Sequence, residues 1–213
     1  MRSMPALYII TGSNGAGKSS IGPEYLPTQI RELYPVFDGD LLFVRKQREL
    51  FPEQIPSPKE ARKLAYEFVS DTFDRLVEEA LDRNDTFVYE GHFTNDATWF
   101  TPKRFKDAGY EVHLIFLGVK TPEISHLRVT DRVNDGGHYV DRLTIESNFY
   151  GNLEKLNQYL DLIDHLTIID TSGIKHSTLV IISYGKVKSA VAPHELPQWF
   201  ITYLPRVMVL IYS

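Results

Sequence analysis

The sequence has no cysteine among its 213 residues, which excludes disulfide bonds, thiol nucleophiles and cysteine metal sites. It has no apolar run near the roughly 20 residues that cross a bilayer. The first predicted strand begins close to the N-terminus, so no signal peptide is expected. The formal net charge is −5, whereas nucleic-acid binders usually carry a basic surface. We therefore expect a cytoplasmic protein whose partner is neither a membrane nor a nucleic acid.

Two further absences narrow the chemistry. The sequence contains no N-K-x-D motif, which is typical of GTPases, and no long second domain of the kind that motor ATPases carry. Histidines such as His92 and His138 stand alone in the sequence, without a trio of ligands at metal-site spacing. We therefore expect no metal ion held by protein side chains alone. The length and the ordinary composition, with 43% hydrophobic and 24% charged residues, suit one globular domain over residues 1–213.

Residues 12–19 match the pattern G-x-x-x-x-G-K-[ST] of a phosphate-binding loop, or P-loop. The apolar run at 7–10 predicts a buried strand before the loop. A helix is expected to open at Ser19, and Pro23 and Pro27 predict that it is short or kinked. Glycines let the backbone turn its N–H groups toward phosphate oxygens, and a helix N-terminus adds positive charge. Lys18 is expected to reach the β- and γ-phosphates, and the Ser19 hydroxyl to ligate Mg²⁺. The predicted nucleotide-binding residues are Gly12, Ser13, Asn14, Gly15, Ala16, Gly17, Lys18, Ser19 and Ser20. ATP is the expected nucleotide, GTP stays open, and the alternative is a glycine-rich turn that binds nothing.

Strand-like and helix-like segments alternate along the chain, which predicts βαβ units and a parallel sheet. Short apolar strands are expected near 34–37, 86–89, 110–117 and 166–169. Helices are expected over 41–50, 58–81, 96–106, 122–132 and 141–162, the second of them with one continuous buried face. Segments 178–183 and 187–192 predict a hairpin. The expected fold is an α/β P-loop NTPase, a three-layer sandwich with a mainly parallel sheet, a core over 7–170, and a C-terminal hairpin and tail over 178–213.

Carboxylates follow two of the predicted strands, where the ends of parallel strands share one crevice with the P-loop. Asp40 is the expected base that accepts the proton of an acceptor hydroxyl, with Asp38 as the competing candidate. The alternative is a pair of turn aspartates that bond their own backbone. Glu90 ends the next strand, with His92 beside it. Glu90 is expected to bind the acceptor or to act on Mg²⁺ through water, and the alternative is a purely structural role.

A basic segment further along the chain carries Arg128, Arg132 and Arg142 around the glycine pair at 136–137. Arginine binds phosphate oxygens in pairs and stabilises transferring charge. These residues predict a mobile lid over the triphosphate, with Arg132 in the catalytic role. The alternative is a charged, solvated helix. Taken together, the motifs favour a small-molecule kinase over a nucleotide-dependent regulator of a protein partner or a simple ATPase.

The P-loop, the 37–40 and 89–92 segments and the stretch 132–140 together resemble the zeta-toxin-like P-loop kinases, over about residues 7–170. The resemblance implies phosphorylation of UDP-N-acetylglucosamine on its 3′-hydroxyl and an antitoxin protein as partner. By motif it implies that Lys18 and Ser19 hold the nucleotide and Mg²⁺, that Asp40 is the base, and that Asp74 and Glu90 face the acceptor. The strand-end motif of the family is closer to Glu-Gly-Thr-x-Arg, whereas here Glu90 and its glycine precede His92.

Overall fold

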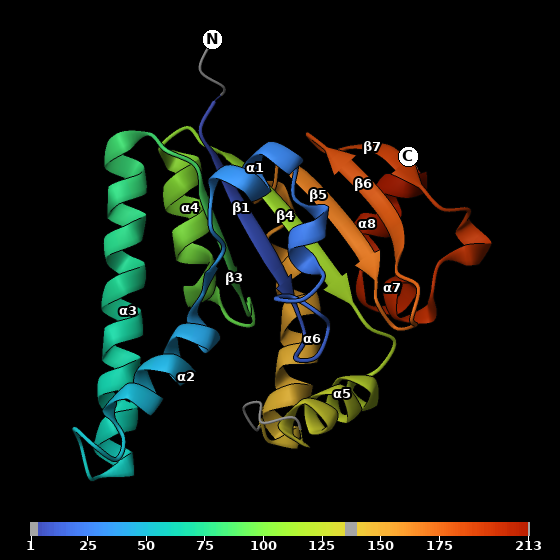
Figure 1. Cartoon of the computed structure of the whole chain (residues 1–213). Coiled ribbons are helices and arrows are strands. Elements are labelled where there is room, and N and C mark those ends of the chain that lie inside the picture. Colours follow the sequence, from blue (N-terminus) through green and yellow to red (C-terminus); the bar gives the residue numbers. More distant parts are fainter. Residues whose placement is uncertain (1–3, 135–139, 213) are drawn as a thin grey trace.

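A seven-stranded sheet forms the centre of the computed structural model, which describes residues 4–134 and 140–212 (Figure 1). The strands run in the order β2-β3-β1-β4-β5-β6-β7, and the first five are parallel. Strands β6 and β7 are antiparallel and form the predicted hairpin. The strands are β1 (Ala6–Gly12), β2 (Phe37–Asp38), β3 (Phe87–Gly91), β4 (Glu111–Gly118), β5 (His165–Asp170), β6 (Ser177–Ser183) and β7 (Lys186–Ala190). The predicted α/β fold with a mainly parallel sheet is confirmed.

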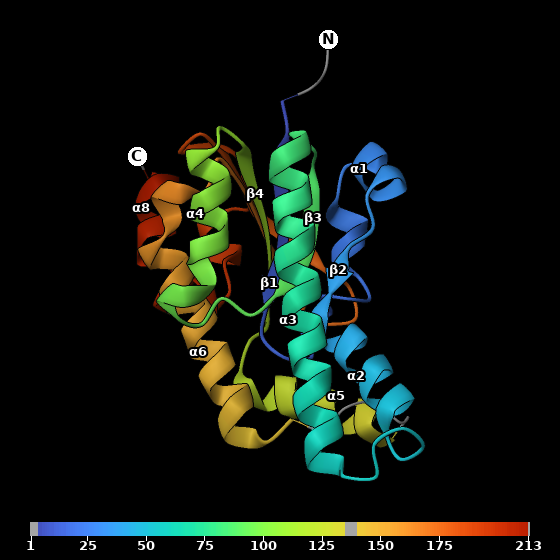
Figure 2. The same ribbon diagram turned by 90° about the vertical axis from the view of Figure 1, so that its left-hand side faces the viewer.

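The two central strands are apolar on both faces because helices or loops cover both faces of the sheet. Every residue of β1 is buried, and the last five residues of β4 are buried as well. Figure 2 shows α4 (Phe100–Asp107), α6 (Arg142–Gln158) and α8 (Pro205–Tyr212) on one side of the sheet and α1 (Thr28–Leu33) on the other. Helix α5 (Pro122–Asn134) lies beyond the carboxyl ends of the strands. Among the described residues, no helix combines the length and apolar character that a bilayer crossing requires.

Helix α3 (Pro58–Arg83) begins as the sequence predicts, with the Ser57 side chain accepting the Glu60 N–H and Pro58 in the first turn. Its 26 residues span about 39 Å, longer than any strand, so the helix extends past the sheet. The expected single buried face is therefore divided. Its C-terminal half packs on the main core, whereas its N-terminal half packs on α2 (Gly39–Leu50) in a small second core of Phe43, Leu50, Ala61 and Ala65.

The segment after the P-loop differs from the prediction, because no α-helix opens at Ser19. The N–H groups of Ile21 and Gly22 close one turn on the Gly17 carbonyl, and a 3-10 helix over Gly22–Tyr25 follows. Pro23 starts that short helix, and a Cβ on Gly22 would lie 2.5 Å from the Ile10 side chain. Close packing on β1 and the prolines at 23 and 27 therefore limit this segment to short turns.

The C-terminal tail is part of the main core. Leu196, Trp199, Phe200, Leu204 and Val207 are buried against the sheet, in and around α7 (Gln198–Tyr203) and α8. A Cβ at position 118 would lie 2.1 Å from the Trp199 ring, so the indole seats directly on the glycine that ends β4. The predicted tail therefore completes the sheet's covering layer instead of standing apart from it.

Candidate functional site

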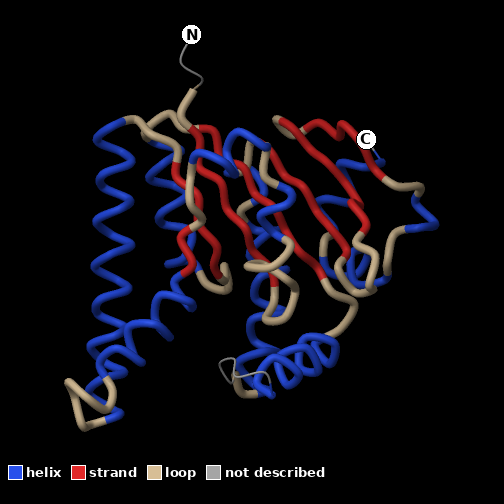
Figure 3. Tube along the Cα trace, in the orientation of Figure 1, coloured by secondary structure: helices blue, strands red, loops and turns tan. Residues whose placement is uncertain are grey.

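The loops that follow β1, β3 and β5 lie at one edge of the sheet, where parallel strands end (Figure 3). A cavity of about 550 Å³ opens at this edge. It is lined by Asn14, Gly15, Gly17, Lys18, Ser19, Ser20, Asp38, Asp40, Leu41, Val44, Arg48, Glu90, Arg128, Arg132 and Val140. Most residues that the sequence analysis predicted for nucleotide and acceptor binding therefore meet in one place, which is the site expected for a doubly wound sheet.

The P-loop connects β1 to this cavity, and at two of its glycines a side chain is disfavoured. Gly12 has φ +146°, and a Cβ there would lie 2.2 Å from the Leu117 carbonyl oxygen of β4. Gly15 has φ +70°, where L side chains are strained. Ser13 and its partner Ser125 on α5 share a buried hydrogen bond of 2.8 Å. The loop is thus held against β4 and α5, and its backbone is kept in a fixed shape at the cavity floor.

Lys18 lies at the cavity floor, and only 9% of the residue is exposed. Its amine donates to the carbonyl oxygens of Gly12 at 3.3 Å and Ser13 at 3.2 Å, and it lies 3.3 Å from His92 Nε2. Burial lowers the pKa of Lys18, although the nearby carboxylate of Glu90 opposes that shift. A buried ammonium that bonds mainly to neutral acceptors is suited to an anion, and the phosphates of a nucleotide would supply one.

Glu90 connects the end of β3 to the P-loop. Its Oε1 accepts a 2.7 Å hydrogen bond from the Ser19 hydroxyl, whereas its Oε2 is buried with no partner among the described residues. Burial and the neighbouring charge of Asp38 raise the pKa of Glu90 to about 7. A buried oxygen with an unused lone pair, next to the P-loop hydroxyl, fits the oxygen ligands and bound waters that Mg²⁺ takes in nucleotide sites.

His92 joins a polar network that sequence reasoning did not find. Its Nε2 lies 3.4 Å from Asn14 Nδ2, and burial with the nearby Lys18 charge holds its pKa well below the usual range. Asn148 on α6 donates to Asn14 Oδ1 at 2.8 Å, and buried Asn152 accepts from the Phe93 N–H at 2.7 Å. Their spacing of four residues on an otherwise apolar helix face was the available signal.

Asp38 and Asp40 both line the cavity but are held differently. Asp38 caps α2, and its side chain accepts the Leu41 N–H at 2.8 Å. Asp40 lies in the first turn of α2 and is exposed to solvent. Asp38 therefore bonds the backbone of its own turn, as the alternative from the sequence has it, whereas Asp40 lines the cavity. Helix α2 thus supplies two acidic groups to the wall opposite the P-loop.

The three arginines of the predicted lid have three different positions. Arg128 connects the P-loop to the turn after β5. Its guanidinium donates hydrogen bonds to the carbonyl oxygens of Gly15 at 3.2 Å, Thr171 at 2.6 Å and Ser172 at 3.1 Å. Arg132 lines the cavity from α5. Arg142 pairs with Glu146 at 2.8 Å and lies outside this cavity. The predicted glycine hinge, with His138, falls at 135–139, outside the described residues.

Asp74 does not reach the cavity. It lies on the exposed side of α3, where its charge acts on Arg104 of α4. A second cavity of about 390 Å³ adjoins the first, and the two share Asp38 and Leu41. Its other walls come from β2, α2, α3 and the start of β3, and its charged groups are Arg45, Arg83, Asp38, Glu79 and Asp85. The space next to the P-loop therefore continues into a second cavity.

A comparison with protein families matches residues 1–182 to the family described as Zeta toxin. The chain belongs to the zeta toxin family. Its P-loop and this membership identify it as a P-loop kinase, an enzyme that transfers phosphoryl groups. A search of curated proteins found no match.

Solved structures share the fold at low sequence identity. A chain of the PezAT chromosomal toxin–antitoxin system of Streptococcus pneumoniae matches with a TM-score of 0.56 and 20% identity, over 81% of this chain and 72% of that one. A chain of the AvrRxo1-ORF1:AvrRxo1-ORF2 structure with ATP matches with a TM-score of 0.70 and 14% identity, over 95% of this chain. The match covers only 64% of that chain. At these identities the likeness extends to the fold.

Proposed function

We propose that the protein transfers the γ-phosphoryl group of ATP to a hydroxyl of a small molecule, with UDP-N-acetylglucosamine or another nucleotide-sugar as the acceptor. The observation that carries this proposal is the meeting of Lys18, Ser19, Asp40, Glu90 and Arg132 around one cavity. Family membership supports the reaction class. The adjoining cavity, lined by Arg45 and Arg83 together with Asp38, Glu79 and Asp85, offers further space and polar groups for an acceptor.

The nucleotide is held by the P-loop. Lys18 leaves its carbonyl partners for the β- and γ-phosphates, and the loop N–H groups surround the phosphate oxygens. Ser19 and Glu90 are the residues that would hold Mg²⁺, directly or through water. When bound, Mg²⁺ neutralises charge on the phosphate oxygens. Arg132 faces the same cavity and stabilises charge on the transferring group.

The acceptor is activated by Asp40. Its carboxylate orients the acceptor hydroxyl and takes its proton while the new oxygen–phosphorus bond forms at the γ-phosphorus. The bond between the γ-phosphorus and the bridging oxygen breaks, and ADP leaves with that electron pair. Because such transfer depends mostly on position and charge, an aspartate in the first turn of α2 serves as the base.

A panel assay tests the reaction. Purified protein is incubated with γ-labelled ATP, Mg²⁺ and single nucleotide-sugars, including UDP-N-acetylglucosamine, and the products are separated. We expect label in the nucleotide-sugar, and none when Lys18→Ala replaces the wild type. Label found only in inorganic phosphate would establish the simple ATPase instead. Tight ATP binding with neither product would favour the nucleotide-dependent regulator.

The second candidate function is that of a toxin held by an antitoxin protein. Its support is the family to which this chain belongs and the similarity of its fold to a chain of the PezAT toxin–antitoxin system. Expression of the wild type in a bacterial host should arrest growth, and Lys18→Ala should relieve the arrest. Equal growth of wild type and variant, at equal protein levels, would refute the toxin proposal. The result of the kinase assay would be unaffected.

A further inference from the structure

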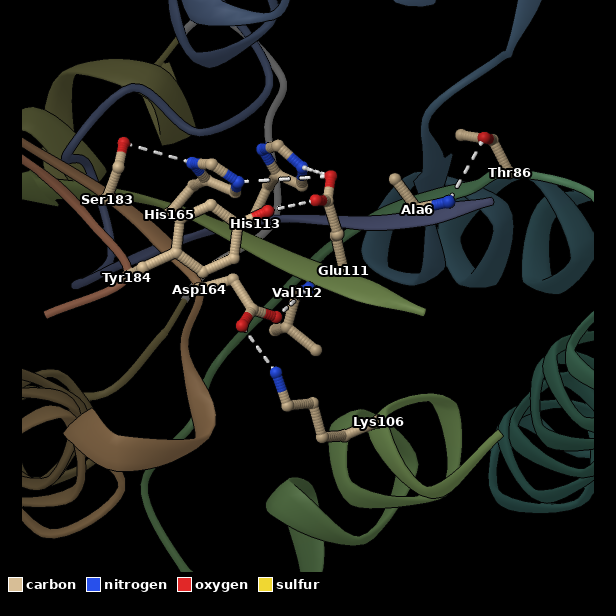
Figure 4. A network of polar contacts seen from close by, with 10 residues as sticks. All are labelled: Ala6, Thr86, Lys106, Glu111, Val112, His113, Asp164, His165, Ser183 and Tyr184. Carbon is tan, nitrogen blue, oxygen red and sulfur yellow. Dashed lines mark hydrogen bonds and ion pairs between the residues drawn. The ribbon is translucent and has the colours of Figure 1, made fainter. Parts of the chain in front are cut away.

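Two histidines and a glutamate gather at the edge of the sheet opposite the P-loop (Figure 4). Glu111 and His165 are the first residues of β4 and β5, and His113 stands two residues into β4. The P-loop begins at Gly12, the last residue of β1, at the other end of the parallel strands. This cluster is therefore separate from the phosphoryl-transfer site. The sequence analysis expected no such group, because 52 positions separate His113 from His165.

The sheet itself brings the three side chains together. His113 and His165 are direct neighbours in the parallel register of β4 and β5. Glu111 and His113 are two residues apart on one strand, so their side chains leave the same face. Tyr8 is the register neighbour of His113 on β1, and the two rings stack with centroids 4.3 Å apart. The positions are thus set by hydrogen-bonded backbone and a packed neighbour.

The inner atoms of the cluster face one another, and two of the outer atoms are held. Glu111 Oε2 lies 3.5 Å from His113 Nε2 and 3.9 Å from His165 Nε2, and one ligand atom from each residue lies within 4.8 Å of the others. The other Glu111 oxygen accepts the Tyr184 hydroxyl, and His165 Nδ1 lies 3.1 Å from the Ser183 hydroxyl. Metal-binding histidines and carboxylates usually have such outer partners, which fix the orientation of the ligating atom.

His113 supplies an observation that internal hydrogen bonding does not explain. Its Nε2 is buried and has no hydrogen-bond partner among the described residues, since 3.5 Å to Glu111 is too long for a good bond. Native proteins rarely leave a buried ring nitrogen without a partner.

We propose that Glu111, His113 and His165 bind one divalent transition-metal ion, with zinc as the best match to two imidazoles and a carboxylate. Zinc takes nitrogen ligands at about 2.0–2.1 Å and often keeps a fourth position for water. Imidazole nitrogens favour such ions over Mg²⁺ and Ca²⁺. The two rings now stack, with centroids 4.2 Å apart and planes 15° apart. Binding therefore turns the rings about their Cβ–Cγ bonds until both Nε2 lone pairs point to one centre, linking β4 to β5.

The test is zinc binding by nucleotide-free protein in an excess of Mg²⁺, which occupies the carboxylates of the other site. Isothermal titration measures stoichiometry and affinity, and thermal unfolding measures stabilisation. Wild type and the control His176→Gln, an exposed histidine outside the cluster, should bind one zinc per chain and unfold at higher temperature with zinc. Glu111→Gln and His165→Gln should bind at least about tenfold more weakly and lose that rise.

A second variant keeps the test decisive if a ligand substitution impairs folding. Ser183→Ala removes only the partner of His165 Nδ1 and should weaken zinc binding by about tenfold. Cobalt in place of zinc should give visible absorption bands in the wild type that are absent in His165→Gln. Equal zinc affinity in wild type, His165→Gln and Ser183→Ala would overturn the proposal, as would the absence of zinc binding by the wild type.

Discussion

Glu90→Gln is the substitution whose effect follows most directly from the site. The pKa of Glu90 is raised from 4.5 to about 7, mainly by burial. In the folded state Glu90 therefore keeps its proton over a pH range in which the same carboxyl group of the unfolded chain has lost it. Between about pH 4.5 and 7 the folded state binds more protons, so this group makes stability fall as pH rises through that window. A pKa difference of this size lowers the free energy of unfolding by about 3 kcal/mol at pH 8, relative to a neutral group at this position.

Replacing the carboxyl group of Glu90 by a neutral amide removes its contribution to the pH dependence of stability. We expect Glu90→Gln to be more stable than the wild type at pH 8, by up to about 3 kcal/mol, and to match it near pH 4.5. Urea unfolding of the nucleotide-free protein at pH 5, 6, 7 and 8 measures the difference. Glu53→Gln, on an exposed loop, is the matched control. A constant stability difference between Glu90→Gln and wild type at all four pH values would refute the assignment.

Three further predictions concern the loop, the lid and the tail. Lys18→Met should lower ATP affinity about 10- to 100-fold in equilibrium binding, because it removes the charge-assisted bonds to phosphate; unchanged affinity would contradict the placement of the nucleotide. Arg128→Ala should lower the stability of the nucleotide-free protein by about 2 kcal/mol through its backbone hydrogen bonds, whereas Arg142→Ala on the solvent side should change it little; a lid role for Arg128 alone would leave stability unchanged. Trp199→Ala should cost about 3–5 kcal/mol in urea unfolding, and a loss below about 1 kcal/mol would show that the tail is dispensable.

Local sequence patterns predicted the parts of the fold that local physics sets. The P-loop, the cap at Ser57 and the hairpin after β5 depend on residues close together in the chain, and all three stand where the sequence placed them. The carboxyl-end rule for parallel strands brought Asp40 and Glu90 to the P-loop without any knowledge of the strand order. These elements therefore followed from spacing and residue type alone.

The remaining features depend on contacts between distant segments. The absence of an α-helix at Ser19 reflects the close packing of Gly22 on β1 together with Pro23 and Pro27, and only the prolines are visible in the local sequence. The role of Arg128 depends on the turn after β5, 43 positions away, and Asn148 of α6 reaches Asn14 of the P-loop across 134 positions. The placement of Asp74 on the solvent side of α3 likewise follows from how that helix packs, since half a turn of rotation about the helix axis would have directed the side chain toward the opposite side.

The central claim is that Asp40 is the base of a phosphoryl transfer to a small-molecule hydroxyl. Its most direct test measures ATP affinity and the transfer rate on the same Asp40→Asn preparation, with Asp71→Asn on the exposed side of α3 as control. We predict a rate about 10²- to 10⁴-fold below wild type with ATP affinity nearly unchanged. A rate within about tenfold of wild type would contradict the claim, and so would a parallel loss of ATP affinity.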